Sequence, residues 1–181
     1  EAAFYGPKLD VEVKPAVGPE VTLSTCQLDF LLPRRFELNY IDSNGEKQVP
    51  VVIHRAIFGT FDRFTAFIIE ETKGAFPLWL APSQIVIVPV NSEIHADYAY
   101  KVKEALASEG FRVEVDARNE KLGYRIREAQ LKKIPVEIVV GDGEIAEGSV
   151  NIRRFGVQGN TSMKLEDAIA LFKDEVKKFT C

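Results

Sequence analysis

The stretch Ile-Val-Ile-Val-Pro-Val at residues 85–90 decides the fold of the larger part of this chain. A short, continuous apolar run of this kind is typical of a strand that is buried on both faces of a sheet. A helical pattern follows over residues 94–109, with Val102 and Leu106 on one face, and residues 111–115 then alternate as a strand does. Alternation of strand and helix predicts a parallel sheet with helices on its faces.

The same alternation continues to the end of the chain. We expect a helix over residues 121–132, a strand at 136–140, a Gly-Asp-Gly turn at 141–143, a strand at 150–154 and a last helix at 165–179. The resulting sheet is predicted to be mixed and mainly parallel, because strands and helices follow one another in sequence.

The chain before this region is expected to be antiparallel. Residues 9–13 alternate between apolar and charged, a second strand covers 22–32, and Asp-Ser-Asn-Gly at 42–45 predicts a hairpin turn between FELNYI and QVPVVIH. A helical repeat begins at Phe61 and ends at Gly74. The prolines and the tryptophan of FPLWLAP mark a break in composition, so we place the boundary between two domains, residues 1–76 and 77–181.

Composition limits the possible classes of protein. Of 181 residues 46% are apolar, which is enough for a core, and a net charge of −4 excludes a generally basic coat for nucleic acid. The two cysteines, Cys26 and Cys181, form neither a disulfide framework nor a zinc cluster, which favours a reducing, cytoplasmic setting. No apolar run reaches the roughly 20 residues of a membrane span. Because the chain starts at Glu1 without a methionine, we expect it to be a piece of a longer protein.

The densest basic stretch is RNEKLGYRIREAQLKK, residues 118–133. Arg118, Lys121 and Arg125 are spaced by about one helical turn and predict a local anionic-ligand patch near the start of a helix. Asn119 is expected to cap that helix or to hydrogen-bond a base edge. The alternative is a solvated helix face, which is the usual explanation of a charge run.

Two arginines on the following strand, Arg153 and Arg154, favour a ligand-binding patch over a solvated face. Guanidinium planes stack on splayed bases and pair with phosphates, which suits single-stranded RNA loops better than duplex DNA. Glu144 and Asn151 provide polar groups for base edges beside them. Tyr124 is either stacking surface or core.

The first domain contains several candidates for an anionic ligand. Lys8, Gln27, His54 and Arg63 lie on or near its predicted strands and helix, and a neutral His54 is able to bind zinc. Each also has a structural explanation: a solvated strand end, a sheet-edge hydrogen bonder, a core histidine satisfied by a neighbour, and a helix arginine with its charge in water. His95 is expected to be an exposed residue near a helix start, without a role.

Five sequence blocks, taken in order, resemble one family. EAAFYGPKLD, TCQLDFLLPRRFELNY, PVVIHRAIFGTFDRF, FPLWLAP and DARNEKLGYRIREAQLKKIP are similar to the carboxy-terminal part of the threonyl-tRNA synthetases, which are class II aminoacyl-tRNA synthetases. The resemblance covers essentially the whole chain. It implies an α/β fold: a mixed, mainly parallel five-stranded sheet with flanking helices in 77–181, the anticodon-binding domain, preceded in 1–76 by part of an antiparallel class II catalytic sheet with motif 3.

The resemblance also implies roles for residues of the first domain. His54 matches a ligand of the catalytic zinc, and Arg63 matches the motif 3 arginine that holds ATP. Tyr5 and Lys8 match residues beside the amino acid and the adenylate, and Gln27 matches a residue that lines the threonine pocket.

In the second domain the resemblance assigns anticodon contacts to Asn119, Arg127, Glu144 and Arg153. One departure concerns the first domain: Asp62 stands before the motif 3 arginine where the family usually has glutamate. We expect the shorter acid at this position to hold the site less firmly.

The intact enzyme that the chain resembles is a cytoplasmic homodimer that uses zinc and Mg-ATP, activates threonine and transfers it to tRNA(Thr), without membrane or DNA partners. Motifs 1 and 2 and the other zinc ligands would lie upstream of Glu1. We therefore expect the isolated chain to be inactive in aminoacylation and to hold no stoichiometric zinc.

Two other classes of function are open from the sequence. One is a non-catalytic RNA-binding accessory module with an anticodon-binding-type domain. The other is an interaction fragment whose exposed strand edges pair with another chain.

Overall fold

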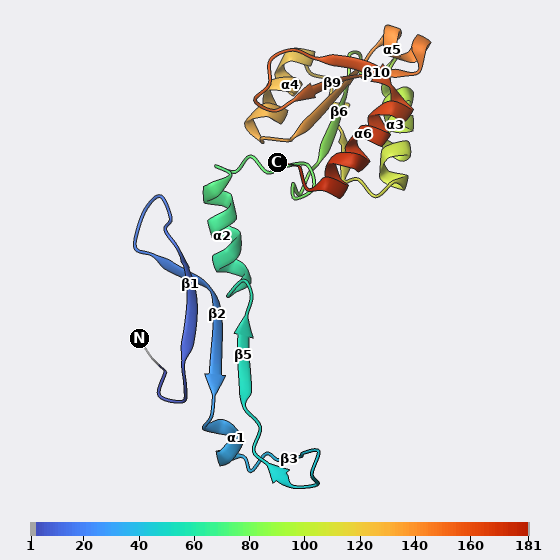
Figure 1. Cartoon of the computed structure of the whole chain (residues 1–181). Helices are drawn as coiled ribbons and strands as arrows, with labels where there is room; N and C mark the ends of the chain where they lie inside the picture. Colours follow the sequence, from blue (N-terminus) through green and yellow to red (C-terminus); the bar gives the residue numbers. More distant parts are fainter. Residues whose placement is uncertain (1–2, 181) are drawn as a thin grey trace. The chain divides into compact units, whose positions relative to one another are not determined.

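The computed structural model describes residues 3–180. The chain divides into two compact units, Glu1–Lys73 and Gly74–Cys181 (Figure 1), and each is described by itself. No helix in the described part of the chain has the length and apolar character needed to cross a membrane.

The first unit is built on a three-stranded antiparallel sheet. Its strands β1 (Lys8–Val13), β2 (Val21–Asp29) and β5 (Val52–Ala56) lie in the order β1-β2-β5. The helix α2 (Phe61–Glu71) follows β5, and the Thr60 hydroxyl caps it by accepting the N–H of Arg63 at 3.3 Å. The expected antiparallel strands and the expected helix after them are both present.

Two details of the first unit differ from expectation. The strand β2 ends at Asp29 rather than continuing to residue 32, because the Asp29 carboxylate accepts the backbone N–H groups of Leu31 and Leu32, both at 2.9 Å, and turns the chain into the short helix α1 (Leu32–Arg35). The predicted turn at 42–45 joins only β3 (Tyr40–Ile41) and β4 (Lys47–Gln48), and β5 pairs with β2 instead of lengthening this hairpin.

The second unit contains a mixed five-stranded sheet, as predicted. The strands are β6 (Ile85–Pro89), β7 (Val113–Val115), β8 (Val136–Val140), β9 (Ser149–Arg154) and β10 (Thr161–Lys164). They lie in the order β10-β9-β8-β6-β7. The strand β6 is parallel to both of its neighbours, whereas β9 runs antiparallel to β8 and to β10. The short strand β10 has no counterpart among the strands expected from sequence pattern.

The helices of the second unit are α3 (Ala96–Ser108), α4 (Leu122–Leu131), α5 (Asp142–Glu147) and α6 (Leu165–Lys178). The expected Gly-Asp-Gly turn is wrong, since residues 142–147 form α5. The Glu144 carboxylate accepts the N–H of Gly141 at 2.9 Å at the start of this helix, and Gly148, with φ of 62°, ends it in the left-handed conformation that glycine favours.

Helices cover the two faces of the five-stranded sheet unequally. The main core lies on the face covered by α3 and α6, where side chains such as Ile85, Ile87, Val102, Leu106, Ile138 and Phe172 are fully buried. On the other face α4 packs against β6, with Ala129 next to Val86 and Val88. Beyond β6 on this second face, Val139, Asn151 and Arg153 remain half-buried. This part of β8 and β9 is called the open face below.

Candidate functional site

The sheet of the first unit aligns several predicted site residues in one row. Lys8 lies opposite Gln27, and Gln27 lies opposite His54, so residues from β1, β2 and β5 share one face. The Tyr5 hydroxyl donates a hydrogen bond of 2.8 Å to Gln27 Oε1, and its ring meets the His54 ring edge-on with centroids 6.2 Å apart. We call Tyr5, Lys8, Gln27 and His54 the strand row.

His54 is fixed in the row by a buried acid. Its Nε2 lies 2.8 Å from Oδ2 of Asp29, whose side chain is fully buried. Burial alone would raise the pKa of Asp29, but hydrogen bonds from His54 and from the N–H groups of Leu32 and Leu31 outweigh it and hold the pKa below its usual value. Asp29 was not singled out from the sequence, although an acid at the end of a strand was the available signal.

The row offers one position to a metal ion. A carboxylate that fixes one ring nitrogen of a histidine leaves the other nitrogen as the ligand, which is the usual support of a metal-binding histidine. No group of three or more metal-ligating side chains occurs within residues 3–180. His54 thus fits a single ligand of a metal that would need further donors.

The two cationic candidates of the first unit lie in different places. Lys8 Nζ is 2.8 Å from Asp10 Oδ2 and belongs to the row. Arg63 lies in the first turn of α2, where its Nη1 donates to the Thr22 carbonyl at 3.3 Å. It lines a cavity of about 240 Å³ with apolar side chains of β1 and β2, including Leu23. The described residues show no contact between Arg63 and the row.

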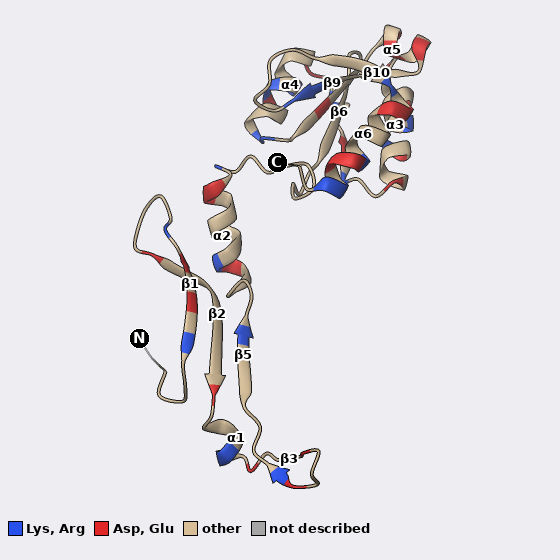
Figure 2. Cartoon of the chain, in the orientation of Figure 1, with Lys and Arg blue, Asp and Glu red and all other residues tan. Residues whose placement is uncertain are grey.

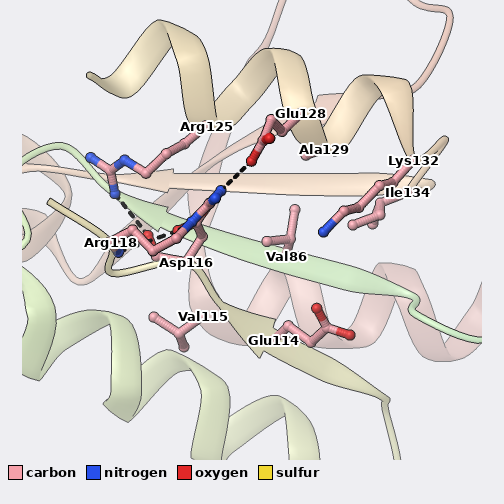
Figure 3. Close-up of a pocket in the computed structure, with 10 residues that line it drawn as sticks. All are labelled: Val86, Glu114, Val115, Asp116, Arg118, Arg125, Glu128, Ala129, Lys132 and Ile134. Atoms are coloured by element: carbon pink, nitrogen blue, oxygen red, sulfur yellow. Dashed lines mark hydrogen bonds and ion pairs between the residues drawn. The ribbon is translucent and has the colours of Figure 1, made fainter. Parts of the chain in front are cut away.

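In the second unit, Arg118 of the predicted basic patch is neutralised by two acids. Figure 3 shows the Arg118 side chain lying between Asp116 and Glu128, with its Nη2 at 2.7 Å from Asp116 and 2.5 Å from Glu128. These two carboxylates raise the pKa of Arg118. In turn Arg118, and then Tyr124, lower the pKa of Glu128. The cluster lines a cavity of about 200 Å³ whose floor includes Val86.

Arg125 is a structural residue, and the expectation that it joins the patch is wrong. Only 1% of it is exposed, and it donates to the carbonyls of Asp116 at 2.7 Å, Glu120 at 3.1 Å and Val90 at 3.4 Å. Its guanidinium therefore ties the loop ahead of α4 to the end of β6. Burial lowers the pKa of this arginine.

Three other candidates of this stretch, Asn119, Tyr124 and Arg127, lie at the surface. Lys121 is the N-cap residue of α4, so the expectation that Asn119 caps this helix is wrong. Asn119 and Arg127 are exposed, and neither has a side-chain hydrogen bond or ion pair within the described part of the chain. Tyr124 is half exposed and donates to Glu128, which places it at the surface rather than in the core.

The two consecutive arginines of β9 point to opposite faces of the sheet. Arg154 forms an ion pair with Glu175 of α6 and lies 5.3 Å from the centre of the Phe172 ring, on the main-core side. The expectation that it adds to a ligand patch is therefore wrong. Arg153 lies on the open face near Asn151, with 36% of its side chain exposed.

Basic and acidic positions alternate along the ribbon of the second unit (Figure 2). Figure 2 shows Lys and Arg positions interspersed with Asp and Glu on both units. Individual residues are therefore the candidates for contact with a polyanion. Asn119, Arg127 and Arg153 are accessible for such contacts, and Glu144, half-buried, uses one carboxylate oxygen to cap α5.

His95 is buried, contrary to expectation. Only 4% of it is exposed; the Asn91 N–H donates to its Nδ1 at 3.0 Å, so its Nε2 carries the hydrogen and faces Asp142 Oδ1 at 3.1 Å. It connects the end of β6 with the start of α5. No sequence signal separated this histidine from an exposed one.

Comparison with known proteins agrees with the two-unit division. Residues 84–175 match a family model described as an anticodon binding domain, and residues 1–72 match a model of the class II tRNA synthetase core domain of the G, H, P, S and T types. The chain therefore belongs to the class II aminoacyl-tRNA synthetases that have this anticodon-binding domain.

Individual relatives are more specific. The chain is 61% identical over 178 residues to a threonine–tRNA ligase of Geobacillus sp. strain WCH70, and 60% identical over 179 residues to that of Listeria monocytogenes serovar 1/2a. These matches cover 98% and 99% of this chain but only 28% of each relative. It also superposes with a TM-score of 0.88 and 34% identity on the RNA-binding domain of threonyl-tRNA synthetase from Cryptosporidium parvum Iowa II, over 96% of this chain and 44% of that one.

Proposed function

We propose that this chain is the carboxy-terminal part of a threonine–tRNA ligase and that its second unit recognises the anticodon of tRNA(Thr). The observation that carries the proposal is the identity of 61% across 98% of the chain with an enzyme of that name. On this proposal the domains are 1–76, the end of the catalytic domain, and 77–181, the anticodon-binding domain, and the protein acts in the cytoplasm.

The proposed anticodon contacts are Asn119, Arg127, Glu144 and Arg153. The exposure of Asn119 and Arg127 supports this, because a base edge reaches side chains that are not already paired inside the protein. Arg153 keeps 36% of its side chain exposed, and Glu144 uses only one carboxylate oxygen to cap α5. Arg127 and Arg153 provide planar donors for bases and phosphates, and the carboxylate of Glu144 accepts from base amino groups.

The strand row is the proposed amino-acid side of the catalytic site. Lys8 supplies positive charge near a carboxylate or adenylate, while Tyr5 and Gln27 hold each other in place and present polar atoms to the substrate. His54, oriented by Asp29, is the proposed zinc ligand, and a zinc ion bound there would polarise the groups of threonine that it contacts. Arg63 is proposed to hold ATP.

This division of roles predicts that the isolated chain does not catalyse the reaction. Threonine activation depends on charge stabilisation and positioning around the α-phosphate, and the row supplies only part of the groups involved. Threonine-dependent exchange of ATP and pyrophosphate should therefore be absent from the purified chain, and robust exchange would contradict this. Zinc after dialysis should be far below one equivalent, as measured by elemental analysis.

The test of anticodon recognition is a binding titration at one fixed, moderate salt concentration, because phosphate contacts alone change affinity by orders of magnitude with salt. The ligands are the anticodon stem-loop of tRNA(Thr) and a stem-loop altered only in the anticodon. We expect a preference for the first of about 1 kcal/mol or more, as one good base contact provides. Arg127→Ala should reduce this preference.

A matched control removes one positive charge elsewhere on the same unit. Lys101→Ala alters α3, which covers the opposite face of the sheet, and should leave the preference unchanged. Equal binding of both stem-loops would favour the accessory RNA-binding module instead. Absence of RNA binding, together with an apparent molecular mass of the chain that rises with protein concentration, would favour an interaction fragment.

A further inference from the structure

A buried acid lies beneath the arginine of the open face. Glu137 on β8 is 1% exposed, and the strand register places it between Val86 of β6 and Arg153 of β9. Neither of its carboxylate oxygens has a hydrogen-bond partner among the described residues. An acid in this state is costly to keep ionised, so its nearest cation determines its behaviour.

The nearest cation is Arg153, and the two side chains are close without being locked together. Arg153 Nε lies 3.8 Å from Glu137 Oε2, which is ion-pair distance but longer than a hydrogen bond, and this Nε is also buried without a hydrogen-bond partner. The Arg153 side chain as a whole keeps 36% exposure. One edge of the guanidinium therefore faces the acid while part of the side chain remains accessible from the open face.

We propose that Glu137 is a positioning residue of the RNA interface that acts through Arg153: when ionised, it holds the guanidinium against the sheet and offsets its charge. This inference rests on the proposed anticodon-binding function, because it assumes that Arg153 contacts RNA. A phosphate or base acceptor then competes with Glu137 for the same guanidinium, and protonation of Glu137 ends the competition.

The surroundings of Glu137 make this coupling specific. Burial raises the pKa of Glu137, and Arg153 partly opposes that rise. Of the neighbouring elements, β6 contributes the apolar Val86, α4 contributes Ala129 beside it, and β7 contributes Glu114, which the register places on the far side of Val86. Arg153 is thus the charged group that faces Glu137 directly in the described structure.

RNA binding and protonation of Glu137 should favour each other. When RNA engages Arg153, the cation stabilises the Glu137 carboxylate less, so the pKa of Glu137 is higher in the complex than in the free protein. Binding therefore takes up a proton, and affinity should increase as pH falls, by no more than tenfold per pH unit for a single group.

The experiment measures the affinity of the tRNA(Thr) anticodon stem-loop between pH 5.5 and 8 at constant salt. Glu137→Gln keeps the size of the side chain and removes its charge. At pH 7.5 it should bind the stem-loop about threefold more tightly, as expected for removing one charge near a phosphate in a medium of high dielectric constant. Its pH dependence should be smaller than that of the wild type.

Two comparisons separate this role from a structural one. Glu114→Gln removes an acid from the same row of the sheet, two strands farther from Arg153 than Glu137 is. It should change RNA affinity less than Glu137→Gln does, and it should leave the pH dependence of binding unchanged. In an Arg153→Met background the Glu137→Gln substitution should have no effect on affinity. Glu137→Met, of similar volume, replaces Glu137→Gln if the amide variant does not fold.

The outcomes distinguish this inference from the proposed function. Selective binding by the wild type, with affinity and pH profile unchanged in Glu137→Gln, overturns the role of Glu137 and leaves the proposed function intact. If Glu137→Gln raises the affinity equally in the Arg153→Met background, the role of Glu137 is also overturned, because the effect would not pass through Arg153. Binding that ignores the anticodon and is unaffected by Arg153→Met overturns both.

Discussion

Replacing Arg125 by methionine should destabilise the second unit by about 3 kcal/mol, because two short hydrogen bonds from a charged donor are lost, each contributing about 1.5 kcal/mol. These are the bonds to the carbonyls of Asp116, at 2.7 Å, and of Glu120, at 3.1 Å. The third, to Val90 at 3.4 Å, is long and adds little. Methionine fills similar space and offers no donor, so the carbonyls lose their partners without a large cavity.

Urea denaturation followed by tryptophan fluorescence is the appropriate assay. Trp79 is the one tryptophan in the sequence, it lies in the second unit, and its ring meets that of Phe179 edge-on at 5.3 Å, so its emission reports unfolding of this unit. Arg127→Met, two residues away on α4 and exposed, is the matched control and should stay within about 0.5 kcal/mol of the wild type. Equal stability of the two variants, with RNA binding weaker in Arg125→Met than in the wild type, would refute the structural role and return Arg125 to the ligand patch.

Three further predictions concern other contacts. Arg154→Met should lower the stability of the second unit by about 1–2 kcal/mol through loss of the Glu175 ion pair and the Phe172 contact, and leave stem-loop affinity unchanged in the titration above. The pKa of Asp29 in the folded state lies below its ordinary value, so its contribution to stability is present above about pH 3.8 and is lost as pH falls through the folded pKa. Asp29→Asn should remove this loss of stability in acid, as measured by circular dichroism of the chain during acid titration. Burial raises the pKa of Glu137 in the folded state, so its contribution to the free energy of unfolding is lost as pH rises from 4.5 through the folded pKa. Glu137→Gln should therefore make the free energy of unfolding, measured by urea titration, depend less on pH in this range. An unchanged pH dependence would contradict this prediction.

Strong periodic patterns predicted the second unit well. The apolar run of β6, the alternation at β7 and the mainly apolar run of β8 gave correct strands, because burial on one or both faces leaves a direct mark on residue order. Short elements left no such mark. The helix α5 depends on one glutamate that caps it and one glycine that ends it, and four-residue β10 depends on pairing with β9, which lies earlier in the chain.

The candidate site was predictable by residue type and only partly by environment. The strand row depends on the pairing of three strands, which the spacing within one strand cannot predict. The family resemblance named the residues of the row but not their register. The two arginine pairs show the limit most clearly. Arg125 and Arg127 differ by two positions on one helix, and Arg153 and Arg154 by one on a strand, yet in each pair one partner is bonded inside the fold and the other is accessible. The partners decide this: Arg154 meets Glu175, which lies 21 positions away in sequence, and Arg125 meets backbone carbonyls of the loop ahead of α4, whose positions depend on the fold.

The position of β6 at the inside of the sheet has a consequence for synthesis on the ribosome. This strand is made before every strand that pairs with it, and it is apolar along its whole length, so a nascent chain exposes two unsatisfied edges of an aggregation-prone segment. The partner on one side, β7, emerges first, and β8 closes the other side only after α4 has been made. Translation that pauses before β7 is made would therefore prolong the state in which both edges of β6 are open, and a pause between β7 and β8 would prolong the state in which one edge is open. Chaperones that bind extended apolar strands would act in these intervals.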